Sequence, residues 1–258
     1  MTDLLRDSFK YRELIWALAM KELTVRYKRS VLGFLWALLN PALFMLVLTV
    51  VFSTVMPIAI PHYAVFLLST LVPWTFFSQG ATYAVESIVM NSDLIKKVAV
   101  PKVVFPVAAV VSNLINFALS LIPLLLIVLI MRHPFYWTWI LLPISVIALS
   151  IFTLGFGLFF ATANVYYRDV SHIVQILMNL WFYVTPIIYK VDAFPPKFRW
   201  IFRLNPILYV LNDFRMFVYY GQVPTALSIL GSFVCAGGAL VIGYWFFRKH
   251  QSEFVFYV

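Results

Sequence analysis

The side chains that could do chemistry are few and widely spaced in this sequence. The ten acidic residues are scattered, and no two of them lie within one helical turn in or near an apolar stretch. The chain also contains no Gly-x-x-x-x-Gly-Lys-Ser/Thr loop for cradling nucleotide phosphates. The four histidines match no metal-ligand spacing and stand at His62, His133, His172 and His250. We therefore predict no catalytic residues, no metal site and no cofactor on this chain.

Aromatic side chains are the other chemically distinctive group, at 18% of the residues. Several lie within apolar stretches rather than only at their ends. Aromatic ring faces can stack on the apolar C–H faces of sugars, and Trp and Tyr also donate hydrogen bonds. These rings are candidates for lining a path along which a sugar polymer slides, although core packing or lipid contact would explain any single one. The candidates are Trp36, Trp74, Phe77, Trp181, Phe182 and Tyr183.

The elements that carry these residues are long apolar segments. The chain is 63% hydrophobic and 11% charged, with a mean hydropathy of +0.94. Five stretches lack Asp, Glu, Lys and Arg altogether: 31–85, 103–131, 133–167, 170–189 and 216–247. About 20 apolar residues cross a bilayer. We therefore expect an all-α integral membrane protein, with a cytoplasmic segment 1–30 and one permease domain 31–258 of six spans at 32–56, 63–85, 103–131, 137–164, 172–188 and 227–247.

The distribution of Lys and Arg predicts how these spans are oriented. Most of the 19 basic residues lie before the first span, in the loop after the second and in the C-terminal tail. Basic loops stay in the cytoplasm, so both termini are expected there. The segment 190–222 between the last two spans opposes this rule with five basic residues. It also contains two amphipathic stretches, 197–204 and 207–220, which either dip into the outer leaflet as re-entrant helices or lie flat on it.

Residues 9–29 contain no helix breaker and precede the first span. We expect a helix at the cytoplasmic boundary, with lipid on one side and a protein partner on the other. A plain basic anchor against anionic lipid is the alternative. The stripe of three- and four-residue spacing that supports the helix comprises Lys10, Glu13, Ala17, Lys21, Thr24 and Lys28.

Five motifs in register resemble those of a known transporter family. They are residues 21–36 (KELTVRYKRSVLGFLW) with Asn40-Pro41, 73–77 (PWTFF), 164–169 (NVYYRD), 185–189 (TPIIY) and Asn205-Pro206. Together they resemble the permease subunits of ABC transporters that export surface polysaccharides. The resemblance is greatest to O-antigen exporter permeases, with capsule and teichoic-acid exporters as relatives, and it covers nearly the whole chain.

This resemblance implies an assembly that the residues alone do not show. It implies a homodimer with a conduit at its interface, two copies of a cytosolic ATPase that binds ATP and Mg, re-entrant helices before the last span, and a polyprenyl-diphosphate-linked glycan as substrate. The location implied is the bacterial inner membrane. The ATPase would meet the N-terminal helix and the loop 87–102, and the residues assigned to that contact are Lys21, Glu22, Arg26, Lys28, Asp93, Lys96 and Lys97.

Arg168 and Asp169 precede the fifth span and have two interpretations. Arg168 could hold the diphosphate headgroup or brace a gate. The structural alternative is a salt-bridged helix start, with Asp169 near the positive end of the helix dipole.

Four other function classes fit the sequence less well. An ABC exporter of a drug or small lipid is opposed only by the family motifs. A membrane enzyme acting on polyprenyl lipids would need clustered carboxylates, or a nucleophile beside a base. A secondary transporter would hold ionisable groups within its spans. Nucleic-acid binding would need a continuous basic patch interleaved with aromatics, which is absent from the sequence.

Overall fold

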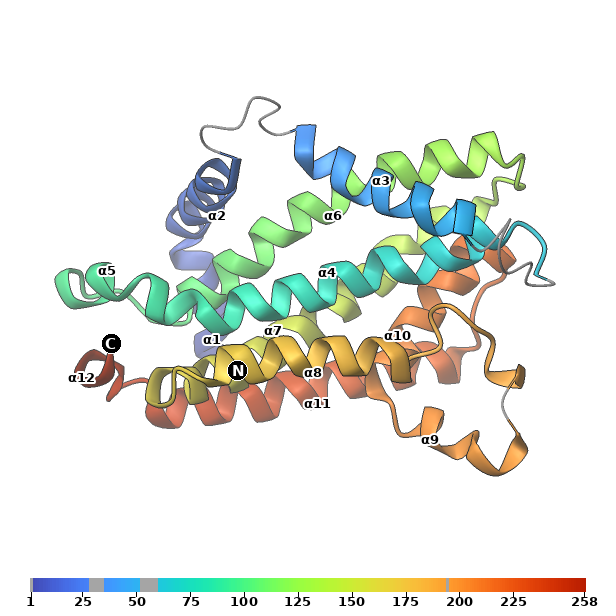
Figure 1. Ribbon diagram of the computed structural model, residues 1–258. Coiled ribbons are helices and arrows are strands. Elements are labelled where there is room, and N and C mark those ends of the chain that lie inside the picture. Colours follow the sequence, from blue (N-terminus) through green and yellow to red (C-terminus); the bar gives the residue numbers. More distant parts are fainter. Residues whose placement is uncertain (1, 28–34, 52–59, 194) are drawn as a thin grey trace.

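Long apolar helices lie side by side in the computed structural model (Figure 1). It describes residues 2–27, 35–51, 60–193 and 195–258, and none of these forms a strand. Within lipid, a helix satisfies its backbone hydrogen bonds internally, which is why apolar spans fold this way. Four helical segments are long and apolar enough to cross a membrane: α4 (Tyr63–Met90), α6 (Val104–Ile130), η3 with α7 (Trp137–Leu141 and Leu142–Tyr166) and α11 (Ala226–His250).

Two shorter helices occupy the predicted first and fifth spans. They are α3 (Trp36–Val50) and α8 (Val170–Val184), each of 15 residues. At 1.5 Å per residue α8 is ~22 Å long, which is less than the ~30 Å hydrocarbon core. The remaining ends of the predicted first span lie outside the described residues. α8 ends at Val184, four residues before the predicted end of the fifth span, because Thr185 precedes a proline and is extended.

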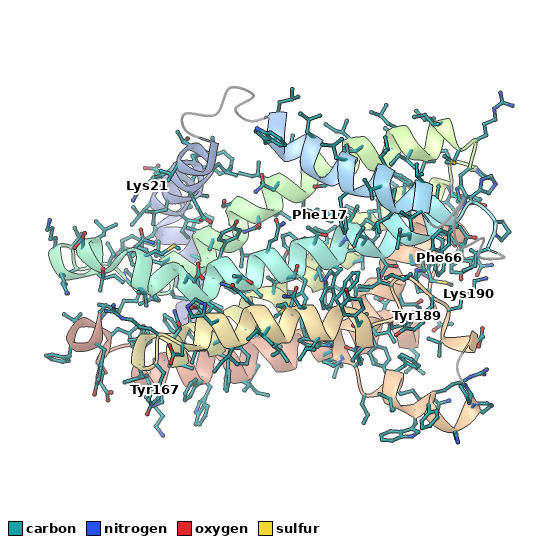
Figure 2. The ribbon with its side chains drawn as sticks, in the orientation of Figure 1. Lys21, Phe66, Phe117, Tyr167, Tyr189 and Lys190 are labelled. Atoms are coloured by element: carbon teal, nitrogen blue, oxygen red, sulfur yellow. The ribbon has the colours of Figure 1, made fainter. Side chains whose placement is uncertain are left out.

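Both chain termini lie at one end of the helix bundle. There, α1 (Thr2–Lys10) and α2 (Arg12–Tyr27) precede the first span, α5 (Ser92–Lys97) follows α4, and α12 (Phe254–Tyr257) closes the chain. Leu4, Ile95 and Phe254 share one hydrophobic cluster, so the two termini and α5 meet. Figure 2 places Lys21 and Tyr167 at this end and Tyr189 and Lys190 at the other.

The opposite end is built by the segment between α8 and α11. Its elements are η4 (Val191–Ala193), η5 (Pro196–Phe198), α9 (Trp200–Arg203), α10 (Pro206–Arg215) and the π-helical turn η6 (Met216–Tyr220). Asn205-Pro206 separates the two stretches 197–204 and 207–220 that the sequence predicts, and Gly221 ends the second. Gly221 has φ +63°, a conformation that glycine adopts without strain. α10 packs against α4, α7 and α11 rather than lying on the surface of the bundle.

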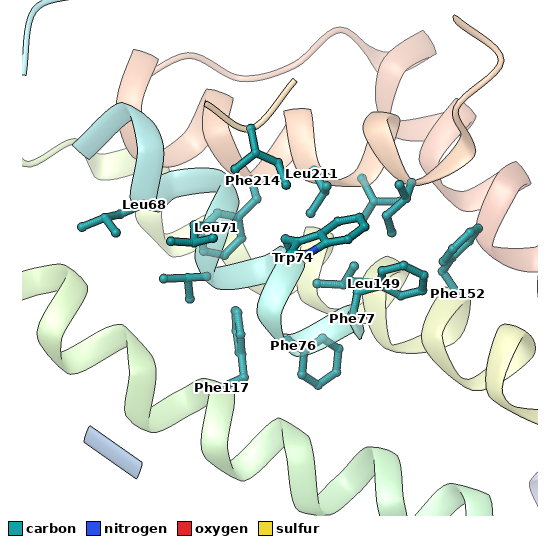
Figure 3. Packing of buried hydrophobic residues seen from close by; sticks show 14 of the residues in the cluster. Leu68, Leu71, Trp74, Phe76, Phe77, Phe117, Leu149, Phe152, Leu211 and Phe214 are labelled. Carbon is teal, nitrogen blue, oxygen red and sulfur yellow. The ribbon is translucent and has the colours of Figure 1, made fainter. Parts of the chain in front are cut away.

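The core forms around α4, which contacts α6, α7, α8 and α10. Figure 3 shows Trp74 and Phe77 of α4 among side chains of the neighbouring helices. α7 and α11 approach still more closely, because glycines face each other where they cross. A Cβ on Gly155 would collide with the backbone at Ala239, and one on Gly243 would collide with the carbonyl of Gly155. Gly155 thus permits close helix packing.

Candidate functional site

α8 has three distinct sides. Its protein-facing side is apolar, with Val174 and Met178 buried and Trp181 half-buried, and this side packs against α4 and α7. Its exposed surface is divided into two stripes. The first is apolar and comprises Ile173, Ile176, Leu177, Leu180 and Val184.

The second exposed stripe of α8 is polar. Its residues follow each other at intervals of three and four, so they share one helix face. They are His172, Gln175, Asn179 and Tyr183, all of them exposed. An amide placed in hydrocarbon without a hydrogen-bond partner costs about 2 kcal/mol or more. Hydrocarbon would therefore be an unfavourable surrounding for this stripe, and water or a polar partner a favourable one. Gln175 has one such partner, since its Nε2 donates to Oε1 of Glu86 at 3.3 Å.

The predicted aromatic residues fall into two groups. Trp74 and Phe77 are buried, at 5% and 0% exposure. Trp181 stacks edge-on against both, with ring centroids 6.3 and 5.5 Å away, and Phe182 lies 5.9 Å from Trp74. Tyr183 is 70% exposed. The structure therefore leaves Tyr183 on the surface and gathers four other rings in the core between α4 and α8. These four are Trp74, Phe77, Trp181 and Phe182.

Trp36 belongs with the exposed group, since 42% of its surface is open on α3. A conduit role for Trp74 and Phe77 stays a prediction, as does that of the other four rings. The burial of Trp74 and Phe77 changes how the conduit role can be tested. Replacing the buried Trp74 with alanine would leave a cavity costing ~3–5 kcal/mol, so lost activity in that variant would not isolate a contact with cargo. Substitutions at Tyr183 are free of this ambiguity.

The unwound segment after α8 is held by side chains from two other elements. Nη2 of Arg215 donates to the carbonyls of Pro186 and Ile187 at 3.0 Å each. The hydroxyl of Tyr63 donates to the next carbonyl, that of Ile188, at 2.8 Å. The carbonyls of three consecutive residues, 186–188, thereby accept hydrogen bonds from side chains at a point where the helix no longer supplies backbone donors. Irregular backbone at membrane depth is tolerated only with such partners.

Arg215 itself is buried in an aromatic setting. Its guanidinium lies 4.1 Å from the ring centroid of Phe66, and its Nε has no hydrogen-bond partner among the residues that the structure describes. Burial lowers the pKa of Arg215 to about 10, so it remains charged at neutral pH. The cation–π contact and the two charge-assisted hydrogen bonds compensate part of the desolvation cost.

Asp213, two residues earlier on α10, is oriented toward α11. Its two carboxylate oxygens accept hydrogen bonds from Ser228 at 2.7 Å and Ser232 at 2.5 Å. Burial raises the pKa of Asp213, and these two hydrogen bonds oppose the shift. Asp213 and Arg215 thus anchor α10 to α11 on one side and to the end of α8 on the other.

Two of the sequence motifs meet at the same end. Nδ2 of Asn205 donates to the hydroxyl of Thr185 at 3.0 Å, and the indole nitrogen of Trp181 donates to Oδ1 of Asn205 at 3.0 Å. The start of α10 is therefore tied to the end of α8. The TPIIY and Asn-Pro motifs are parts of one joint.

The NVYYRD motif forms a second joint at the other end of α8. Buried Asn164 donates to the carbonyl of Val85 at 3.2 Å and accepts from the backbone of Ser171 at 3.1 Å. Arg168 and Asp169 are exposed. No ion pair joins them in the part of the chain that the structure describes, and Asp169 precedes α8 without a side-chain cap. The structure thus shows no salt bridge for the structural alternative, although Asp169 does lie at the N-terminal end of α8. The headgroup or gate role of both residues stays a prediction.

The residues assigned to a cytosolic partner lie at this same end of the bundle. In α2, the stripe from Lys10 to Thr24 is exposed as predicted, and the opposite face packs on α6 through Ile15, Ala19 and Leu23. Lys21 belongs to the exposed stripe and Glu22 is half-buried. Asp93, Lys96 and Lys97 are exposed on α5. Lys28 and the side chain of Arg26 lie outside the described residues.

Sequence reasoning missed Asp213, Arg215 and Asn164 as structural anchors. The sequence did contain a signal for Asp213 and Arg215. They are the charged residues of the otherwise apolar stretch 207–220, and two residues apart on a helix they point to nearly opposite sides. Such a placement indicates contacts with two different neighbours. The carbonyls that Arg215 binds, 28 and 29 positions away, could not be read from the sequence.

Comparison with known proteins gives consistent matches along the chain. The family model described as ABC-2 type transporter matches residues 13–219. The O-antigen export system permease protein RfbA of Myxococcus xanthus is 35% identical over 258 residues, which cover 98% of each chain. A protein of the same name from Klebsiella pneumoniae is 37% identical, covering 94% of this chain and 93% of its own. The polysialic acid transport protein KpsM of Escherichia coli is 26% identical, covering 87% and 88%.

Proposed function

This chain belongs to the ABC-2 type transporter family, and from that premise we propose that it is the permease subunit of an ATP-driven exporter of O-antigen. The cargo is a glycan carried on a polyprenyl diphosphate. Relatives at 35% and 37% identity over nearly the whole chain are O-antigen permeases. The polysialic acid relative is more distant at 26%. The chain acts as a permease and not as an enzyme.

The permease has six spans, with α3 in the first and α8 in the fifth, and it works as a homodimer in the inner membrane. The exposed basic residues of α5 and the location of both termini at its end of the bundle support a cytoplasmic position for that end. α10 is re-entrant from the outer side, since it packs among the outer ends of the membrane-capable helices. Two copies of a separate ATPase supply the nucleotide site and bind ATP and Mg. They dock on α2 and α5.

The polar stripe on α8 is the observation that supports a conduit most directly. His172, Gln175, Asn179 and Tyr183 run along most of the length of the helix, and all four are exposed in the protomer. Amides and a phenol can exchange hydrogen bonds with successive sugar hydroxyls, as they do with water. The apolar stripe beside them suits lipid or the second protomer. α8 would thus place one wall of a hydrated path at the dimer interface.

The aromatic residues take two roles in this arrangement. Tyr183 on α8 and Trp36 on α3 lie on open surface, where rings can stack against a passing sugar. Trp74, Phe77, Trp181 and Phe182 form the packed layer behind α8 and fix its position. Arg168 and Asp169, before the first turn of α8, stand where a lipid headgroup would reach the conduit from the cytoplasm.

Depletion of the protein in living cells tests the proposed function. We expect surface polysaccharide to fall while lipid-linked glycan builds up on the cytoplasmic side of the membrane. Re-expression of the intact chain should reverse both changes. If the surface glycan stays normal after depletion, the proposed cargo is wrong, and the exporter would carry a drug or a small lipid instead.

A further inference from the structure

The chemical character of the α8 stripe suggests which glycans can pass. Its exposed side chains are an imidazole, two carboxamides and a phenol, at His172, Gln175, Asn179 and Tyr183. Each can exchange hydrogen bonds with a hydroxyl group. The whole stretch 170–189 that contains the stripe has no Asp, Glu, Lys or Arg. The stripe is therefore polar without carrying a permanent charge.

The fixed charge that touches the stripe is negative. Oε1 of Glu86, near the end of α4, accepts a hydrogen bond from Nε2 of Gln175 at 3.3 Å. Basic residues are absent from the stretch 31–85, which includes α3 and most of α4, as well as from 170–189. Arg168 is the nearest preceding cation in the sequence, and it stands before the stripe begins. A polymer moving along α8 would pass Arg168 before the helix begins and the carboxylate of Glu86 at the cytosolic end. It would meet no Lys or Arg on α8 itself.

We infer that this conduit selects for uncharged glycans, whose repeat units carry hydroxyl groups but no carboxylate or phosphate. The inference rests on the proposed function, since it concerns the same conduit. An anionic polymer would bring a new negative charge past the stripe with every repeat. Without cations those charges stay unpaired in a narrow space between low-dielectric walls, where like charges repel more strongly than in water.

The diphosphate of the carrier lipid does not conflict with this selection. It is one anionic group per polymer and passes once, whereas the charge of an acidic glycan recurs along its whole length. Arg168 lies in the turn before α8, four residues ahead of His172, and is exposed at the proposed cytosolic mouth, where a single diphosphate can be received. The stripe then contacts the glycan chain attached to that headgroup.

Analysis of the native cargo is the first arm of the test. The lipid-linked glycan that accumulates in depleted cells is purified and its sugars are identified. We expect neutral repeat units. Accumulation of a uronate-, sialate- or phosphate-bearing polymer would overturn the selection for uncharged glycans while leaving the export function intact. Absence of any accumulated glycan would instead contradict the proposed function itself.

The second arm changes the charge of the stripe. The full transporter is given two lipid-linked polymers that share the same carrier and differ in one sugar, neutral glucose or anionic glucuronate. We expect the wild type to export the neutral polymer about tenfold faster, because like-charge contacts disfavour the wrong partner. Asn179→Lys should speed export of the anionic polymer and so reduce the ratio of the neutral to the anionic export rate. Asn179→Gln adds no charge and should leave that ratio unchanged. Equal export of both polymers by the wild type would refute the inference.

Discussion

Arg215 offers the sharpest test of how the outer end of the permease is held. Replacing it with methionine keeps a flexible apolar stem, although a shorter one, and removes both hydrogen bonds from Nη2 to the carbonyls of Pro186 and Ile187. Each buried acceptor left without a partner costs roughly 1–3 kcal/mol, and the gain from no longer burying a guanidinium offsets part of the sum. We expect a net loss of about 2–4 kcal/mol.

That loss should be visible as a lower melting temperature of the purified protein in detergent. For a chain of this size, 1 kcal/mol corresponds to about 2–4 °C, so Arg215→Met should melt roughly 5–15 °C earlier than the wild type. Arg203→Met is the matched control, because Arg203 is exposed on the neighbouring helix α9, and it should melt within about 2 °C of the wild type. If Arg215→Met and Arg203→Met melt alike, Arg215 does not anchor the end of α8.

Three further variants test the packing, the outer joint and the cytosolic surface. Gly155→Ala should lower stability, because the added Cβ meets backbone atoms of α11. Gly237→Ala is the control and should be neutral, since its Cβ meets no described atom within 4 Å. Equal melting temperatures of the two variants would contradict the close crossing. Asn205→Ala removes two side-chain hydrogen bonds and should cost ~1–3 kcal/mol, with slower export at normal expression; unchanged stability and export would disprove that joint. Lys96→Glu combined with Lys97→Glu should reduce co-purification of the ATPase without changing the melting temperature; full recovery of the ATPase would remove α5 from the docking surface.

The sequence was sufficient for the helices and for much of their connectivity. Charge-free stretches mark the apolar helices directly, and the break at Asn205-Pro206 and the stop at Gly221 follow from backbone restrictions of proline and glycine. The close crossing at Gly155 was also predictable, since small residues let helices approach. The end of α8 was not placed correctly, because the apolar pattern continues through Ile187 and Ile188 after the helix has stopped.

The anchoring residues could not be predicted, because their partners are distant in sequence. Asn164 and Val85 are separated by 79 positions, and Tyr63 and Ile188 by 125. Composition likewise did not distinguish buried rings from exposed ones. Trp74 and Tyr183 both lie in apolar stretches, yet one is almost fully buried and the other is 70% exposed, and only packing against neighbouring helices decides between them.

The central claim is that the polar stripe of α8 lines a water-filled path, and cysteine accessibility tests it most directly. In a Cys235→Ser background, Asn179→Cys places a thiol on the polar stripe and Leu180→Cys places one on the apolar stripe beside it. Both residues are exposed in the protomer. The assembled transporter, engaged in export, is treated with a charged, membrane-impermeant thiol reagent. We predict rapid modification at position 179 with loss of export, and protection at position 180. Protection at position 179, or equal modification at both positions, would contradict a water-filled path along this stripe.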